Sequence, residues 1–200
     1  DNLEYVWKLW WFKHALLDLG VSPFFHPGVF YPVGYPVALS ETTLAHTVLG
    51  LPLTALLGET VAYNGMIFGS FVLSGYGLFL LARSLGGGVW ASFVAGAAFG
   101  FCPYRMSHLG AGHLPLMGTG WIALLFWALE RLIQRPSWRR GLAVGLFYGL
   151  TGLSSWYYAL MVAPFALLYL LLRARPWRTL LWRRALWLGL ALGGILALTL

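Results

Sequence analysis

Long apolar runs separated by short charged segments dominate the chain from residue 61 onward. Val61–Ala82, Ser84–Tyr104 and Met106–Leu129 contain no Asp, Glu, Lys or Arg. A helix needs about 20 apolar residues to cross a bilayer, and each run reaches that length. A last apolar run, Ala185–Leu200, continues to the end of the chain. The pattern predicts a bundle of membrane-spanning helices.

Gly141–Leu172 is a longer uncharged run with two possible interpretations. A single helix of that length would measure about 48 Å, whereas the hydrocarbon core is about 30 Å thick. Arginines flank the run on both sides, and two crossings would place both groups on one side, as the positive-inside rule favours. Gly and Ser in the segment Thr151–Ser155 suit a tight reversal. We therefore predict a hairpin, which gives about six spans within residues 61–200.

Residues 1–60 do not form a simple span. Glu4–Leu19 reads as an aromatic-rich helix whose charges favour lying in the membrane interface over crossing it. Four prolines between residues 23 and 36 then exclude a regular helix. Ser40 or Thr42 would cap a second helix that ends near Leu57. The predicted fold is all-α: a polytopic integral membrane helical bundle, with residues 1–60 as a large outer loop that holds two interfacial helices.

Composition supports the membrane interpretation. The chain of 200 residues is 60% hydrophobic and only 10% charged, whereas soluble domains have roughly 25% charged residues. The net charge of +7 comes from basic residues beside apolar runs, so we expect contacts with membrane lipids and none with nucleic acid. Cys102 is the only cysteine, so no internal disulfide forms. Because the chain begins at Asp1 and stops within an apolar run, we expect a fragment of a longer membrane protein.

The predicted topology separates the ionisable residues. Most arginines fall on the cytoplasmic side. The outer side receives all five histidines and most of the acids: His14, His26, His46, His108, His113, Asp1, Glu4, Asp18, Glu41 and Glu59. The groups suited to acid–base chemistry therefore gather on one face.

Three acids of the outer loop are candidates for chemistry. Asp1 and Glu4 begin the first interfacial helix, and Glu41 opens the second. An acid in a first helical turn can simply favour the positive end of the helix dipole. Alternatively, each is a carboxylate held at the membrane surface as a general base or metal ligand.

The segment CPYRMSHLGAGHLPL places Arg105, His108 and His113 between two apolar runs. Arg105 and His108 share a face if one helix continues past Pro103. One interpretation is an outer turn whose arginine meets lipid phosphate and whose histidines cap helices. The other is an anion site, because Arg offers a fork to phosphate and His can protonate a leaving oxygen. A His–His spacing of five is not a zinc pattern, so we predict no metal site here.

The order of these features resembles a known family. The stretches DNLEYVWKLWWFKHAL, FYPVGYP, GFCPYRMSHLGAGHLPL and RRGLAVGLFYGLTGLSSWYYAL are similar to the N-terminal half of the C-type membrane glycosyltransferases (the GT-C superfamily). The likeness is to the bacterial branch that includes protein mannosyltransferases and lipid A aminoarabinose transferases.

The resemblance implies a glycosyltransferase of the bacterial inner or plasma membrane with an extracytoplasmic active face. Its partners would be a polyprenyl-phosphate sugar donor and a glycan, lipid or protein acceptor. Asp1 matches the family's first-loop acid, and Glu4 or Glu41 would replace the second acid, because Asn2 stands where the family has Glu. Arg105, His108 and His113 would bind the lipid phosphate. No cofactor is established, and a divalent metal stays open.

Two other functions fit the sequence. A transporter or flippase for lipid-linked sugars would carry charged or broken helices at mid-membrane, whereas here the ionisable groups lie at helix ends. A non-catalytic membrane protein can share the fold, because fold alone does not determine function.

Overall fold

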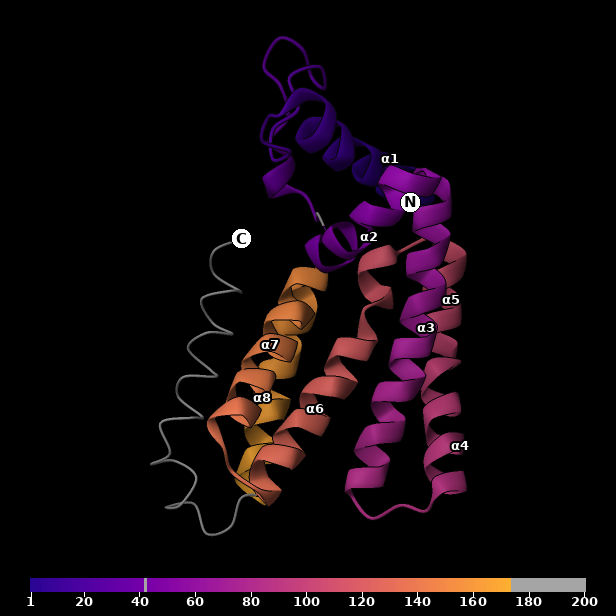
Figure 1. Cartoon of the computed structure of the whole chain (residues 1–200), viewed down its shortest axis with the longest axis vertical. Coiled ribbons are helices and arrows are strands. Elements are labelled where there is room, and N and C mark those ends of the chain that lie inside the picture. Colours follow the sequence, from indigo (N-terminus) through magenta and orange to yellow (C-terminus); the bar gives the residue numbers. More distant parts are fainter. Residues whose placement is uncertain (42, 174–200) are drawn as a thin grey trace.

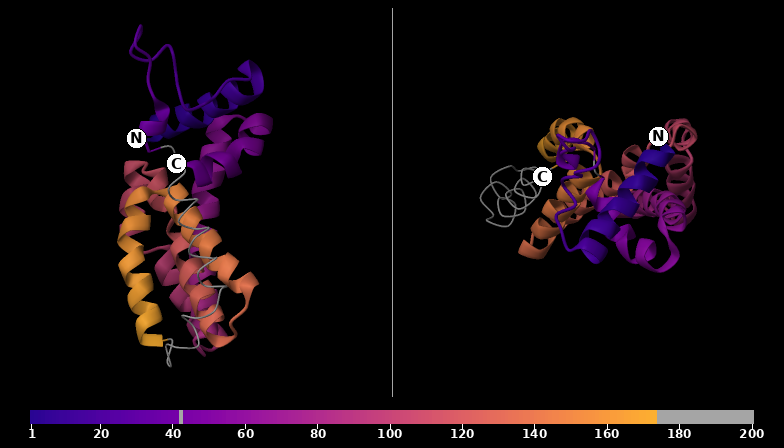
Figure 2. Two further views of the ribbon diagram at one scale, coloured as in Figure 1. Left: turned by 90° about the vertical axis from the view of Figure 1, so that its left-hand side faces the viewer. Right: turned by 90° about the horizontal axis from the view of Figure 1, so that it is seen from above.

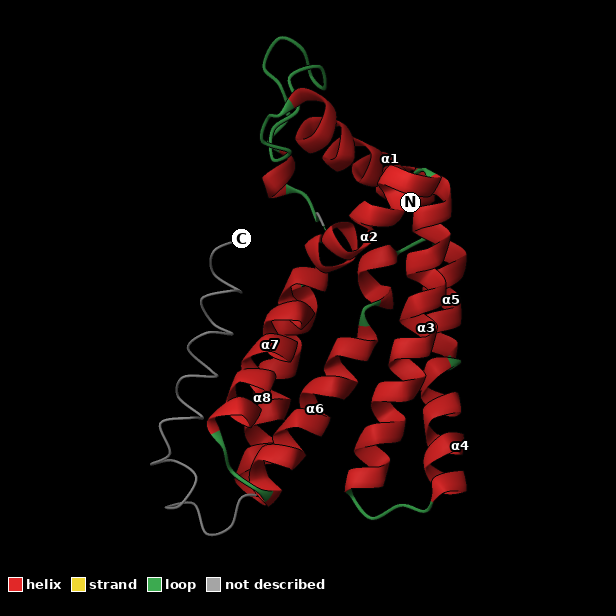
Figure 3. Cartoon of the chain, in the orientation of Figure 1, coloured by secondary structure: helices red, strands yellow, loops and turns green. Residues whose placement is uncertain are grey.

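The computed structural model describes residues 1–41 and 43–173, and its regular elements are helices, without a strand in those ranges (Figure 3). α1 (Asn2–Lys13) continues into a π-helical turn, His14–Leu19. A short 3₁₀ turn, Val37–Leu39, precedes α2 (Leu44–Leu57). Between them, residues 21–36 form a loop that is pinned by an isolated antiparallel bridge between His26 and Tyr35.

The remaining helices run alongside one another, and α1 and α2 lie across one end of them (Figures 1 and 2). We call this the α1–α2 end. The helices are α3 (Glu59–Ser84), α4 (Val89–Gly100), α5 (Pro103–Ala111), the 3₁₀ turn Leu114–Met117, α6 (Thr119–Gln134), α7 (Trp138–Ser154) and α8 (Trp156–Arg173).

Among the described residues, three helices are long and apolar enough to cross a membrane: Glu59–Ser84, Leu114–Gln134 and Trp156–Arg173. Two of the predicted spans have different bounds. Within 84–104 only α4 is a continuous helix, because Pro103 starts α5 as a separate helix. Within 106–129, Gly112 ends α5 with a left-handed backbone, and a 3₁₀ turn precedes α6.

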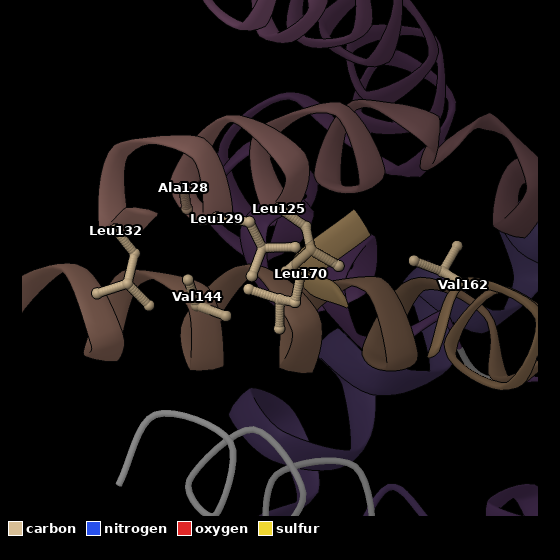
Figure 4. Close-up of a cluster of buried hydrophobic side chains, with 7 residues drawn as sticks. All are labelled: Leu125, Ala128, Leu129, Leu132, Val144, Val162 and Leu170. Atoms are coloured by element: carbon tan, nitrogen blue, oxygen red, sulfur yellow. The ribbon is translucent and has the colours of Figure 1, made fainter. Parts of the chain in front are cut away.

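The predicted break in the run 141–172 is confirmed. α7 ends at Ser154, extended Ser155 follows, and α8 starts at Trp156. The two helices run antiparallel and pack on α6 (Figure 1). Their shared core consists of Leu125, Ala128, Leu129, Leu132, Val144, Val162 and Leu170 (Figure 4). The predicted last span, Ala185–Leu200, lies outside the described residues.

The prediction for the start of the second interfacial helix was wrong. α2 begins at Leu44, and Thr43 is its N-cap, with a left-handed backbone at φ 48°. Glu41 therefore lies in the connection before the helix and does not open it. The proline-rich loop exposes large apolar side chains such as Phe30, Tyr31 and Val33.

The two ends of the bundle differ in charge. α3, α6 and α7 meet at the end away from α1 and α2, where Gln134 Nε2 donates to the carbonyl of Ser84 at 2.7 Å. Arginines 83, 131, 135, 139 and 140 belong to these helix ends. Glu130 is the one acid of this end in the described residues, and it pairs with Arg173 at 2.7 Å. The other acids lie on the elements of the α1–α2 end, as the sequence predicts.

Candidate functional site

The start of α1 lies against the end of α5, and this contact assembles an acid with two histidines. Asp1 Oδ2 is 2.9 Å from His113 Nε2. His113 Nδ1 is in turn 2.8 Å from His108 Nδ1. A line of three ionisable side chains, which we call the Asp1–His113–His108 cluster, thus joins residues that are far apart in the sequence.

A glycine permits this approach. Gly112 adopts φ +75° after the last turn of α5, and a Cβ at this position would overlap the side chain of Asn2. Tyr63 of α3 fixes the same junction, because its hydroxyl lies 3.0 Å from Asn2 Oδ1 and 3.4 Å from the carbonyl of Gly112. Both contacts hold the cluster's backbone in place.

The two histidines of the cluster have different surroundings. Burial, followed by the neighbouring His113, lowers the pKa of His108. His113 instead faces the carboxylate of Asp1. The imidazole of His113 thus lies between the carboxylate of Asp1 and the ring of His108. The side chain of Asp1 is 53% exposed and that of His113 is 34% exposed, so a substrate can reach them.

A second group of polar side chains joins α1 to the reversal between α7 and α8. Lys8 is buried, and its Nζ donates to Glu4 Oε1 at 2.6 Å and to the backbone carbonyl of Glu41 at 2.9 Å. The carboxylate of Glu41 accepts a hydrogen bond from Ser155 Oγ at 2.6 Å. Burial, with the nearby Glu41 and Glu4 carboxylates, raises the pKa of Tyr5 in the same region.

Arg105 does not lie at the surface, contrary to its predicted role as a phosphate clamp. The side chain is fully buried. Its guanidinium donates to the carbonyls of Gly100 and Met117, at 2.9 Å and 2.7 Å, and also to the hydroxyls of Thr119 and Ser70. The ring of Phe71 lies 4.5 Å from its central carbon. Pro103 begins α5 as a separate helix, and Arg105 in its first turn is buried in the interior.

The predicted site residues thus fall into three places. Asp1, His108 and His113 meet, as a shared outer site requires. Glu4 and Glu41 belong to the Lys8 group, and neither contacts Asp1 through a side-chain bond in the described residues. Sequence reasoning missed Lys8 and Tyr63; the only signal for Lys8 was a cation in the middle of an apolar, aromatic helix.

No group of three or more His, Cys, Asp or Glu side chains placed to hold a metal ion occurs in the described part of the chain. The side chains of the cluster, a carboxylate and two imidazoles, are of the kind that transfers protons.

In the part of the chain that the structure describes, the regular elements are thus helices, three of them apolar enough to cross a membrane, with an acid–histidine cluster at one end. It belongs to the DUF6311 family, described as a domain of unknown function, whose model matches residues 4–200. No curated protein and no solved structure matched the chain.

Proposed function

We propose that the chain is part of a multi-pass membrane glycosyltransferase that moves a sugar from a polyprenyl-phosphate donor to an acceptor at the extracytoplasmic face of a bacterial membrane. The observation that carries the proposal is the Asp1–His113–His108 cluster, with its 2.9 Å contact between carboxylate and imidazole. The candidate spans and the arginines at the opposite end of the bundle support a polytopic topology with this cluster outside.

The cluster supplies a base for the acceptor and a group that faces the leaving phosphate. The acceptor hydroxyl oxygen attacks the anomeric carbon, and its proton passes to the free oxygen of the Asp1 carboxylate. The bond between the anomeric carbon and the phosphate oxygen breaks, and the electron pair leaves with the lipid phosphate. The imidazole of His113, which lies between Asp1 and His108, faces the departing phosphate.

Arg105 has a supporting role in this proposal. Because its guanidinium is already occupied by four acceptors in the interior, it fixes Met117 and Thr119 behind the cluster. Glu41 and Glu4 likewise tie α1 to the reversal between α7 and α8, and we assign the base to Asp1 alone.

The test uses purified full-length protein in lipid nanodiscs with sugar-labelled polyprenyl-phosphate donors and an extract of envelope acceptors. The proposal predicts labelled acceptor and free polyprenyl phosphate in equal amounts. His113→Gln should lower kcat by about 100-fold, the lower range for general acid–base groups. His14→Gln is the matched control, because His14 also pairs with an acid, Asp18 at 2.8 Å. Donor crossing the bilayer without any transfer would point to a flippase instead.

A further inference from the structure

A cavity of about 190 Å³ lies where α2 crosses α3 and the start of α6. It shares no residue with the Asp1–His113–His108 cluster. Its wall is largely apolar, with side chains such as Leu49, Met66 and Leu73, and His46 brings an imidazole to it. Leu49 and the lining residue Gly69 are exposed, so the cavity opens at the surface of the bundle between α2 and α3. Cavities with apolar walls accept hydrocarbon groups.

Ser154 sets the tautomer of His46. Ser154 Oγ has one proton, and it donates this proton to the carbonyl of Pro115 at 3.2 Å. The same oxygen lies 3.4 Å from His46 Nδ1, so in this second contact Nδ1 is the donor. Burial, assisted by the charge of Arg105, lowers the pKa of His46 to about 4, so the ring is neutral at physiological pH. Because a neutral imidazole carries a single N–H, Nε2 of His46 is a hydrogen-bond acceptor.

Nε2 of His46 is an acceptor without a partner. The residue is only 5% exposed, and no described residue donates a hydrogen bond to Nε2. Ser154, which contacts Nδ1, does not line the cavity, so the ring faces the cavity with its other edge, which carries Nε2. Buried polar atoms in folded proteins are almost always paired. An unpaired acceptor at a cavity therefore indicates a ligand that brings a hydrogen-bond donor.

The surroundings of the cavity favour a neutral donor. Ser70 and Met117 line the cavity and accept hydrogen bonds from the buried guanidinium of Arg105, at 3.1 Å and 2.7 Å. The positive charge behind the wall disfavours an ammonium head group. An acceptor nitrogen gives no hydrogen bond to the oxygens of a carboxylate or phosphate, so an anion would lose its hydration without compensation. A hydroxyl group is neutral and has the proton that Nε2 lacks.

We propose that this cavity binds a neutral lipid alcohol, with the hydrocarbon chain against the apolar wall and the hydroxyl donating a hydrogen bond to His46 Nε2. The chain leaves through the opening between α2 and α3, at Leu49 and Gly69. The inference does not rest on the transferase proposal, because it uses no residue of the Asp1–His113–His108 cluster.

The experiment labels the full-length protein in nanodiscs with a dodecanol that carries a diazirine in its chain. After photolysis, peptide mapping should find the probe on wall residues such as Met66 and Leu73. Unlabelled dodecanol should compete about tenfold better than dodecyl methyl ether, with each competitor counted per lipid, because one buried hydrogen bond is worth about that factor. The ether keeps the chain and the oxygen but has no proton to donate. Equal competition by the two compounds would mean that any hydrocarbon chain fits, which would overturn the proposal.

Two variants of His46 test the acceptor itself. His46→Phe keeps a ring in the wall and removes the nitrogen, so the probe should still label the cavity while the alcohol loses its advantage over the ether. His46→Gln keeps an acceptor oxygen and should retain the advantage. A preference for the alcohol that persists in His46→Phe would contradict the role of Nε2.

A variant that occupies the mouth of the cavity provides the independent arm. A Cβ at Gly69 would meet nothing within 4 Å, so Gly69→Leu adds a side chain in open space and should abolish labelling of the wall residues. Gly110→Leu on α5, where a Cβ also meets nothing within 4 Å, lies outside the cavity and should be labelled like the wild type. Unchanged labelling in Gly69→Leu would place the probe elsewhere and overturn the proposal.

Discussion

Arg105 holds together three segments that meet at the α1–α2 end. Its hydrogen bonds reach the end of α4, α3, and the turn that leads into α6. Burial lowers the pKa of this guanidinium, and its several bonds offset the cost of removing the charge from water. The residue is therefore structural, although a lone arginine between apolar runs reads as a ligand-binding group in the sequence.

Arg105→Met should lower the free energy of unfolding by about 3 kcal/mol, because it leaves several buried acceptors unpaired. Denaturation in mixed detergent micelles, followed by tryptophan fluorescence, measures the loss. Arg83→Met is the control, since Arg83 makes an exposed bond to the carbonyl of Gly87 and should cost less than about 1 kcal/mol. Equal losses in the two variants would contradict the structural role of Arg105.

His46 should make stability depend on pH. Burial, assisted by the charge of Arg105, lowers the pKa of His46 from 6.5 to about 4. Between these values the unfolded chain binds a proton that the folded chain does not, so the free energy of unfolding falls as the pH drops from about 6.5 to about 4. The full loss is about 3 kcal/mol.

The measurement compares unfolding of wild type and His46→Phe at pH 7 and at pH 4. The wild type should lose about 3 kcal/mol more than the variant over this range. Histidines elsewhere, including His108, contribute equally to both proteins and cancel. An identical pH dependence in the two proteins would show that His46 is not the group responsible.

At the scale of elements, small residues set how closely the helices pack. Gly75 of α3 and Gly96 of α4 meet at a crossing where a Cβ at Gly96 would overlap the carbonyl oxygen of Gly75. Gly77 faces Ala123 and Gly120 of α6 in the same manner. α3 therefore packs between α4 and α6 through backbone contact, as is typical of helices in membranes.

Gly96→Leu should separate α3 from α4 and destabilise the protein by about 1–3 kcal/mol, the usual cost of overpacking. Thermal unfolding in detergent reports the change. Gly69→Ala, on a face of α3 where a Cβ meets nothing within 4 Å, is the control and should be nearly neutral. A neutral Gly96→Leu would mean that the helices do not cross at these glycines.

Some helix boundaries could be predicted from the sequence, and others could not. The Gly/Ser segment before Trp156 predicts the reversal between α7 and α8, because the uncharged run is too long for one crossing and arginines flank it on both sides. The sequence leaves the break at Pro103 open, since an apolar run stays apolar through a turn. Thr43 is the N-cap of α2 and has a left-handed backbone, a conformation that the presence of a threonine does not predict.

At the scale of the whole molecule, the sequence predicts that the acids and arginines lie at opposite ends of the bundle. It does not predict which charged side chains are buried. Hydropathy and arginine counts place the acids and histidines at one end, which brings Asp1, His108 and His113 together. Periodicity does not reveal that Arg105 turns inward or that Lys8 is buried, because both depend on carbonyl groups supplied by distant segments.

The same separation of charge predicts which residues face which side of the membrane. In a full-length protein with Cys102→Ala, a cysteine at Val33 should react with a membrane-impermeant maleimide from outside intact cells. A cysteine at Ser137, between α6 and α7, should react only after the cells are opened. Labelling of both positions in intact cells would contradict the polytopic arrangement.

We propose Asp1 as the base of a sugar transfer, and one comparison of variants tests this role most directly. Transfer from a labelled polyprenyl-phosphate sugar is measured for the full-length wild type, Asp1→Asn and Asp18→Asn. Both acids pair with a histidine, at 2.9 Å for Asp1 and 2.8 Å for Asp18. The account predicts loss of transfer, by about 100-fold or more, in Asp1→Asn alone, with donor binding kept. Normal transfer by Asp1→Asn would contradict it.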